Sequence, residues 1–231
     1  MCSAVVAPLP EAVLWDMDGT LVDTEPLWIA AETPLVAEYG GTWTHEQALQ
    51  LVGLGLDDAA RLLQDAGVRL PVPDIVALLT ERVLTQVRVD GVPFRAGARE
   101  LLASLRAAGV RTALVTMSLG RMAREIVSLI DFDAFDVVIA GDEVTRPKPH
   151  PDPYLRACEA LGVDPGDVVA IEDSPNGLRS ALAAGIASIG VPNVVSLVGV
   201  GAHALWPTLA GRTAADVAAF HAAHRRRENV A

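Results

Sequence analysis

Short runs of apolar and β-branched residues alternate along this chain with longer stretches of amphipathic, helix-like periodicity. The short runs predict buried strands at Ala12–Asp16, Thr112–Thr116, Val137–Ala140, Val168–Asp173 and Ala187–Val191. The longer stretches predict helices at Gly97–Ala108, Gly120–Leu129, Asp152–Leu161, Asn176–Ala184 and, at the end, Thr213–Arg227. Buried strands separated by helices indicate an α/β fold, with helices on both faces of a doubly wound parallel sheet.

The segment between the first two predicted strands is too long for a simple crossover. Helical patterns occur within it at Trp28–Tyr39, Glu46–Leu51, Asp57–Ala66 and Pro73–Val87, and none of its runs resembles a strand. A connection of this size should have structure of its own. We therefore expect a helical cap domain at residues 25–93, inserted into a core domain of residues 1–24 and 94–231. The insertion is either a lid that excludes water and recognises substrate, or an appendage that only stabilises the core.

Composition and charge narrow the classes of partner. The chain has 231 residues, of which 51% are hydrophobic and 20% charged, so it is long enough to bury a full core and is expected to be globular and soluble. A formal net charge of -11 disfavours nucleic acid, because affinity for a phosphate backbone comes chiefly from clustered lysine and arginine. The same charge would repel a small phosphorylated metabolite unless the site contains positive charge of its own.

Terminal and cysteine patterns bear on location. No basic segment precedes an apolar run at the amino terminus, so no secretory signal is predicted, and Cys2 and Cys158 show no metal or redox spacing, which fits a reducing cytoplasm. Residues Ser180–Gly211 contain no Asp, Glu, Lys or Arg, but glycine and proline interrupt them repeatedly. We expect a helix end, a buried strand and a loop there, with no membrane association. No coiled-coil seam is visible, and a monomer is expected.

The most informative motif is Asp16–Thr20, which reads DMDGT and follows the first predicted strand. Two carboxylates so placed meet at the carboxyl edge of a parallel sheet, where such folds bind ligands, and they suit a divalent cation beside a nucleophile. Gly19 allows a sharp turn, and Thr20 offers a hydroxyl and a backbone N–H. The alternative is a polar turn that merely ends a strand.

Three further features lie where strands end or in a loop that follows one. Thr116 is either an anion-binding hydroxyl or an ordinary helix cap. Lys148, between two prolines, is the only lysine in the chain. Its compact ammonium suits a place between a phosphoryl oxygen and a carboxylate, and the alternative is a surface lysine. Asp173 would be a third anionic metal ligand or only a cap, and Glu172 would orient a metal-bound water or support the ligands from behind.

Together, in this order, these motifs strongly resemble the four motifs of the haloacid-dehalogenase-like superfamily, and the resemblance covers nearly the whole chain. It implies a Rossmann-like core with a helical cap inserted between the first and second motifs. Residues Asp23–Trp28 look most like the branch that holds β-phosphoglucomutases and sugar-phosphate phosphatases, especially its hexitol and 2-deoxyglucose phosphate phosphatases.

The resemblance also implies a mechanism. Asp16 would attack phosphorus and form an aspartyl-phosphate, and Asp18 would protonate the leaving alkoxide and then take a proton from water. Mg²⁺ would be held by the carboxylates of Asp16 and Asp173 and by the backbone carbonyl of Asp18. The groups expected to bind the phosphate are Gly19, Thr20, Thr116 and Lys148.

The principal rival is a phosphomutase. Trp28 stands where β-phosphoglucomutases have a cap histidine, and the loop Leu51–Asp57 lacks the arginine and lysine with which those enzymes grip a second phosphate. Arg61 or Arg82 could replace them, unless both are solvated helix residues. A non-enzymatic phospho-ligand-binding protein would be expected to lose a charged catalytic group, and none is missing. We therefore predict hydrolysis of small phosphate monoesters, of the sugar or polyol kind. The cap residues expected to border the substrate are Trp28, Gly53 and Gly55.

Overall fold

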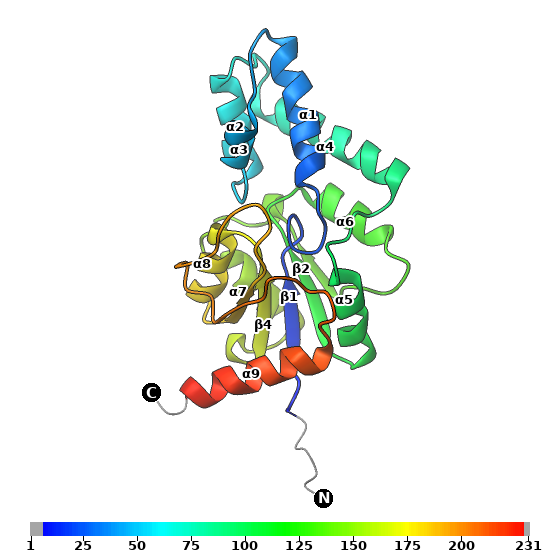
Figure 1. The fold of residues 1–231 in the computed structure, drawn as a ribbon, viewed down its shortest axis with the longest axis vertical. Coiled ribbons are helices and arrows are strands. Elements are labelled where there is room, and N and C mark those ends of the chain that lie inside the picture. Colours follow the sequence, from blue (N-terminus) through cyan, green and yellow to red (C-terminus); the bar gives the residue numbers. More distant parts are fainter. Residues whose placement is uncertain (1–6, 229–231) are drawn as a thin grey trace, which may run out of the picture.

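The computed structural model describes residues 7–228, and its centre is a six-stranded sheet in which all paired strands are parallel (Figure 1). The strands are β1 (Ala12–Trp15), β2 (Arg111–Val115), β3 (Val137–Ile139), β4 (Val168–Glu172), β5 (Ala187–Gly190) and β6 (Ala204–Leu205). Their order is β3-β2-β1-β4-β5-β6, so the chain moves outward from β1 to β3, returns to the other side of β1 and moves outward again. The order in which strands are added to the sheet therefore changes direction between β1 and β4, and open α/β sheets bind ligands at such a point.

Helices cover both faces of this sheet (Figure 1). On one face lie α5 (Ala98–Ala107), α6 (Gly120–Ser128) and α9 (Ala214–Glu228); on the other lie α7 (Asp152–Leu161) and α8 (Pro175–Ala183), with the short 3₁₀ helices η1 (Gly141–Glu143) and η2 (Pro165–Asp167) in connecting loops. Alternate residues of β1 supply the two apolar layers: Val13 and Trp15 face the first group of helices, and Ala12 and Leu14 the second. All four are fully buried, which explains why β1 is apolar at every position.

The long connection after β1 forms four helices beyond the carboxyl edge of the sheet, at the top of Figure 1. They are α1 (Glu25–Glu38), α2 (His45–Leu49), α3 (Leu56–Asp65) and α4 (Val72–Asp90). Leu35 of α1, Leu63 of α3 and Ile75 of α4 are fully buried, so the insertion packs around apolar side chains of its own. We propose that this insertion is the cap domain, with the limits 25–93 expected from the sequence.

The predicted strands and helices are present, with differences at their ends. Asp16, Thr116 and Asp173 begin the loops after their strands instead of ending the strands, because their side chains are turned to polar partners described below. The first helix of the insertion begins at Glu25, earlier than predicted, since Pro26 suits the first turn of a helix. The two-residue strand β6 was not predicted, because so short a run shows no alternation.

The uncharged stretch Ser180–Gly211 contains the end of α8, strand β5, a loop and β6, in agreement with the prediction. Between residues 7 and 228, no helix is both long and apolar enough to cross a membrane. Cys158 is buried on α7, where burial raises the pKa of its thiol to about 11, and Cys2 lies outside the described residues.

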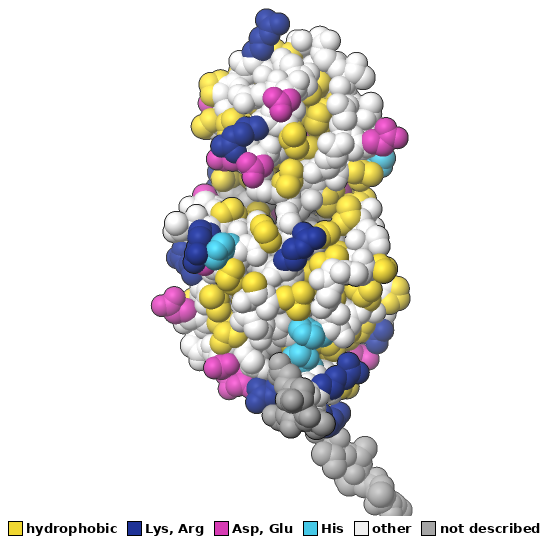
Figure 2. Space-filling model, turned by 90° about the vertical axis from the view of Figure 1, so that its left-hand side faces the viewer, with side chains coloured by type: hydrophobic (Ala, Val, Ile, Leu, Met, Phe, Trp, Pro, Cys, Tyr) yellow, Lys and Arg dark blue, Asp and Glu magenta, His cyan; other side chains and the backbone are white. Residues whose placement is uncertain are grey.

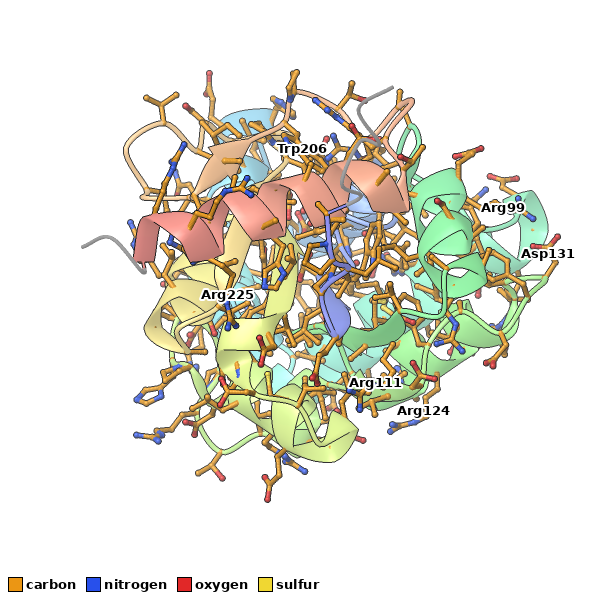
Figure 3. The ribbon with its side chains drawn as sticks, turned by 90° about the horizontal axis from the view of Figure 1, so that it is seen from below. Arg99, Arg111, Arg124, Asp131, Trp206 and Arg225 are labelled. Atoms are coloured by element: carbon orange, nitrogen blue, oxygen red, sulfur yellow. The ribbon has the colours of Figure 1, made fainter. Side chains whose placement is uncertain are left out.

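Arginine side chains are dispersed over the surface instead of gathered in one patch, as the face in Figure 2 shows. Those labelled in Figure 3 are each paired with an acid. These pairs are Arg99–Asp131 at 2.6 Å, Arg124–Glu143 at 2.7 Å, Arg111–Glu11 at 3.0 Å, and Arg225–Asp167. Exposed pairs of this kind contribute little to stability.

Candidate active site

The carboxyl ends of three adjacent strands bring the predicted motifs together. Asp16 follows β1, Thr116 follows β2 and Asp173 follows β4, and these strands are neighbours in the sheet. Lys148 reaches the same place from the loop between η1 and α7, and all four side chains are buried. Residues from separate segments of the sequence thus meet next to β1 and β4, where the order of the strands changes direction.

Lys148 is the centre of a buried ion-pair network. Its Nζ lies 2.7 Å from Asp16 Oδ1 and 2.6 Å from Glu172 Oε1, and it donates to the Val115 carbonyl at 2.8 Å. All three ammonium protons therefore have acceptors. Burial alone would lower the pKa of Lys148, but the charges of Asp16 and Glu172 raise it above its ordinary value. The side chain stays cationic, and among the described residues that line the site it is the only cation.

Glu172 is fully buried, and donors occupy both of its carboxylate oxygens. Besides Lys148, the Tyr154 hydroxyl donates to Oε1 at 2.6 Å, and the Ser174 hydroxyl donates to Oε2 at 3.3 Å. Gly177 leaves room for this carboxylate, since a Cβ there would lie 1.9 Å from Oε1. Burial, and then the charge of Glu172, raises the pKa of Tyr154 well above its usual range, so its hydroxyl remains a donor. Glu172 is thus placed to hold Lys148 and has little capacity left for an ion.

Asp173 has a carboxylate oxygen without a partner. The Thr20 hydroxyl donates to Oδ1 at 3.1 Å, whereas Oδ2 is buried and accepts no hydrogen bond from any described residue. Gly19, with φ of +84°, packs directly against it, and a Cβ at that position would lie 2.1 Å from Oδ2. A buried carboxylate oxygen without a partner is costly, so this atom is suited to bind a cation.

Three buried carboxylates, those of Asp16, Glu172 and Asp173, have oxygens within 4.8 Å of one another. Burial, and then the charge of Glu172, raises the pKa of Asp16 to about 8, although Lys148 acts in the opposite direction. Burial and the charge of Asp16 raise the pKa of Asp173 well above its ordinary value. One lysine does not balance three carboxylates, so a hard divalent cation that prefers oxygen ligands fits this site.

Asp18 lies on the side of the site that faces the insertion, where four donors hold its carboxylate. Oδ1 accepts from the Thr24 hydroxyl at 2.5 Å and from the Trp28 indole N–H at 3.4 Å. Oδ2 accepts from the Ser118 hydroxyl at 2.7 Å and from the Thr116 hydroxyl at 3.3 Å. Because these donors come from both the core and α1, the position of Asp18 depends on how the insertion sits on the core.

Gly19 and Thr20 differ from their expected role at the phosphate. Their backbone N–H groups donate to carbonyls of their own turn, at 2.8 Å and 3.3 Å, and the Thr20 hydroxyl is on Asp173. The turn uses both amides, so these residues shape the loop and hold Asp173 instead of facing a ligand. Thr116 does line the site, although its hydroxyl donates to Asp18 here. The neighbouring N–H groups that have no acceptor in the described chain include those of Met17, Asp18 and Met117.

A pocket lies above these groups, between the core and the insertion, with about 840 Å³ of empty space when the solvent at its mouth is counted. Trp28 and Gly53 line it, as predicted. Gly55 does not: it precedes α3, and a Cβ there would meet nothing within 4 Å. The buried polar groups of the core and the side chains of the insertion therefore border one pocket.

The two arginines considered as grips for a second phosphate both point away from this pocket. Arg61 is exposed and pairs with Asp58 at 2.6 Å. Arg82 donates to the carbonyl of Ala31 at 3.0 Å and pairs with Glu38 at 3.0 Å. The structure therefore supports their interpretation as solvated helix residues.

Contacts on two sides hold the insertion against the core. The Asn176 amide donates to the Gly53 carbonyl at 3.0 Å, and a Cβ on Gly53 would lie 2.9 Å from that of Ser174. Ion pairs between α4 and α6 are Arg88–Glu125 at 2.5 Å and Arg121–Glu81 at 3.2 Å. The insertion therefore roofs the buried groups, which limits the access of water to them.

Some polar residues of the site were not predicted from the sequence. Thr24 and Glu25 lie four and five residues after Thr20, and Ser118 follows Thr116 by two residues, so closer attention to each motif's surroundings could have found them. Nothing local marks Tyr154 or Glu32, because each meets the site only through the packing of its helix.

Residues 13–191 match the haloacid dehalogenase-like hydrolase family, from β1 to just past β5. This is well over half of the chain. The protein therefore belongs to the haloacid dehalogenase-like hydrolase family.

Individual relatives agree with this assignment. The chain is 33% identical to hexitol phosphatase B of Escherichia coli (strain K12), with 78% of this chain and 83% of that protein covered. It is 34% identical to the phosphorylated carbohydrates phosphatase of Thermotoga maritima, with 78% and 83% covered. The crystal structure of CbbY from Rhodobacter sphaeroides in complex with xylulose-(1,5)bisphosphate superposes with a TM-score of 0.77 at 32% identity, covering 88% of this chain and 96% of that one. The predicted superfamily and fold class are confirmed.

Proposed function

We propose that this protein is a Mg²⁺-dependent phosphatase that releases phosphate from small monoesters, of the sugar or polyol kind, through an aspartyl-phosphate on Asp16. The observation that carries the proposal is the setting of Asp16. One of its oxygens is held by Lys148 Nζ at 2.7 Å, and beside it lies Asp173, whose Oδ2 is buried without a partner. A nucleophile, a fixed cation and an unfilled metal ligand on one pocket floor are the parts that phosphoryl transfer requires.

The relatives support the class of reaction. Two of the similar proteins are named as phosphatases, one of hexitols and one of phosphorylated carbohydrates. With the family match, they confirm the sequence-based prediction of a phosphoric monoester hydrolase. The metal, the covalent intermediate and the choice of sugar or polyol esters are our proposal, and a cytoplasmic monomer remains a prediction.

The reaction divides into two displacements. In the first, a carboxylate oxygen of Asp16 forms a bond to phosphorus, the bond from phosphorus to the ester oxygen breaks, and Asp18 gives its proton to the departing oxygen. In the second, Asp18 takes a proton from water as the water oxygen attacks phosphorus, which releases phosphate and restores Asp16. The donors Ser118 and Thr24, at 2.7 Å and 2.5 Å, keep the Asp18 carboxyl at the floor of the pocket.

The residues present fit Mg²⁺, because three buried carboxylates share one lysine and Asp173 Oδ2 has no partner. Asp16, Asp173 and the backbone carbonyl of Asp18 would hold the ion, which when bound supplies positive charge to the phosphate oxygens. Lys148 adds the fixed positive charge on the nucleophile's other side, and the N–H groups without acceptors can bind phosphate oxygens. The site thus contains the positive charge that the acidic chain requires.

The phosphomutase alternative is less supported by this geometry. Trp28 donates to Asp18 at 3.4 Å where a cap histidine would stand, and Arg61 and Arg82 lie outside the pocket. The bisphosphate bound by CbbY is not carried over to this chain for the same reason. A mutase would convert β-glucose 1-phosphate to glucose 6-phosphate when primed with the bisphosphate, whereas we expect free phosphate or no reaction.

The decisive experiment measures phosphate release from p-nitrophenyl phosphate and a panel of sugar and polyol phosphates. We expect release by the wild type with Mg²⁺, none after chelation, and none from Asp16→Asn. Asp131→Asn is the matched control, because Asp131 is exposed and pairs only with Arg99 on the surface. Equal release by wild type and Asp16→Asn would contradict the assignment of the nucleophile.

A further inference from the structure

Glu32, on the insertion, lies in the wall of the pocket, and one of its carboxylate oxygens has no donor among the described residues. Glu32 is only 4% exposed. The Trp43 indole N–H donates to Oε2 at 2.9 Å, and within residues 7–228 nothing donates to Oε1. Oε1 is not itself buried, so it is open to a group that enters the pocket.

Glu25 is the second carboxylate of this wall. It lies on the same helix as Glu32, is half-buried, and accepts no hydrogen bond from any residue that the structure describes. It also borders a second cavity, with Asp23 and His45, so it lies between the two cavities. Two acidic side chains of α1 therefore line the pocket on the side of the insertion.

The rest of the insertion's wall is apolar, built mainly from Leu51, Leu54, Leu56, Val76 and Leu79. The basic residues of the insertion are His45, Arg61, Arg69, Arg82 and Arg88. None of them lines the pocket, and all of the insertion lies within the described chain. Among the described residues that line the pocket, Lys148 is the only cation, and it is already held by Asp16 and Glu172 at the pocket floor.

We propose that Glu25 and Glu32 select the leaving group, binding those that offer hydroxyl or ammonium donors and excluding those that carry a second phosphate or a carboxylate. The inference rests on the proposed phosphatase function and names its substrate class: phosphate monoesters of uncharged or cationic alcohols. Carboxylate oxygens accept hydrogen bonds from such donors, whereas a second anion would lie against like charge in a partly dry pocket without a counter-ion. The leucine and valine side chains of the wall receive the carbon skeleton.

Two matched pairs of compounds test the selection. Sorbitol 6-phosphate and 6-phosphogluconate differ in a hydroxymethyl or carboxylate end, and glucose 6-phosphate and glucosamine 6-phosphate differ in a hydroxyl or ammonium group. Each is measured as a substrate and as a competitive inhibitor of p-nitrophenyl phosphate hydrolysis, at pH 8 with Mg²⁺. Either as a substrate or as an inhibitor, we expect 6-phosphogluconate to be at least about tenfold weaker than sorbitol 6-phosphate. We expect glucosamine 6-phosphate to be no weaker than glucose 6-phosphate.

Variants assign the selection to the two glutamates. Glu25→Gln and Glu32→Gln keep the size of the side chain and remove its charge, so at least one should narrow the carboxylate discrimination by about threefold or more. Glu38→Gln is the matched control, because Glu38 ends the same helix and is paired with Arg82 outside the pocket. Its discrimination should equal that of the wild type.

The outcomes separate this inference from the proposed function. Hydrolysis of p-nitrophenyl phosphate without discrimination between the paired compounds, or discrimination unchanged in both glutamine variants, overturns the role of Glu25 and Glu32 and leaves the phosphatase intact. Absence of Mg²⁺-dependent release from every compound, p-nitrophenyl phosphate included, contradicts the phosphatase itself.

Discussion

Replacement of Glu25 by glutamine is expected to stabilise the protein at alkaline pH. Glu25 is half-buried at the start of α1, and no described residue donates a hydrogen bond to it. Burial, followed by the charges of Asp18, Glu32 and Asp23, raises its pKa from 4.5 to about 7. The folded chain therefore holds this proton more tightly than the unfolded chain does.

The magnitude follows from the interval between the two pKa values of Glu25. Its contribution to stability is fully present below pH 4.5 and is lost as the pH rises through about 7, because the unfolded state releases the proton first. The loss is about 1.4 kcal/mol for each pH unit, which approaches ~3 kcal/mol over the interval. Solvent in the two adjoining cavities screens the carboxylate, so we expect about 1 to 3 kcal/mol.

The assay is urea unfolding of metal-free wild type and Glu25→Gln at pH 5 and pH 8. The variant should exceed the wild type in free energy of unfolding by about 1 to 3 kcal/mol at pH 8 and by less than ~1 kcal/mol at pH 5. Glu38→Gln changes a residue at the exposed end of the same helix. Its difference from the wild type in free energy of unfolding should not grow between pH 5 and pH 8. An advantage of Glu25→Gln that is absent at pH 8, or equal at both pH values, would refute the view that the pocket wall holds a desolvated carboxylate.

Further predictions concern the floor of the pocket. Lys148→Met keeps the apolar bulk of the side chain but leaves buried carboxylates without their cation. It should lose measurable activity and about 3 to 5 kcal/mol of stability, as measured by phosphate release and chemical unfolding. A stable, active variant would contradict the ion-pair network. Ser118→Ala removes the 2.7 Å bond to Asp18, so kcat should fall by roughly tenfold or more for alkyl phosphates and less for p-nitrophenyl phosphate, whose leaving group needs little protonation. Mg²⁺ should raise the Tm of the wild type and have little effect on Asp173→Asn in a thermal-shift titration; an equal rise in both would show that Asp173 is not a ligand.

Much of the fold was predictable because it follows from the local pattern of apolar and polar residues. The five residues of β4 are buried on both faces of the sheet, so they are apolar up to Glu172, and that composition is visible in the sequence. The same holds for parts of the insertion, because apolar residues recur at helical spacing in α3 and α4. The ends were less predictable, since a polar residue such as Asp16 or Thr116 leaves its strand only when it finds a partner in another part of the chain.

The motifs were also readable, but some of their roles were not. The hydroxyl and N–H of Thr20 suggested a phosphate site, yet its own turn and Asp173 use them. Gly55 has the flexibility of a loop near a substrate, and the structure places it outside the pocket. In each case the residue type was informative, but what the residue faces was decided by the packing of the folded chain.

By itself, the sequence determined the alternation of strands and helices, the position of the insertion and the charged groups available for chemistry, because periodicity and residue type are properties of neighbouring residues. Only the tertiary structure decided which of those groups meet. Lys148 reaches Asp16 across 132 positions of chain because β1 lies between β2 and β4. Glu25 and Glu32 become the acidic part of a pocket wall because α1 lies beyond the carboxyl edge of that sheet. Contacts of this kind depend on strand order and helix packing, which no local pattern contains.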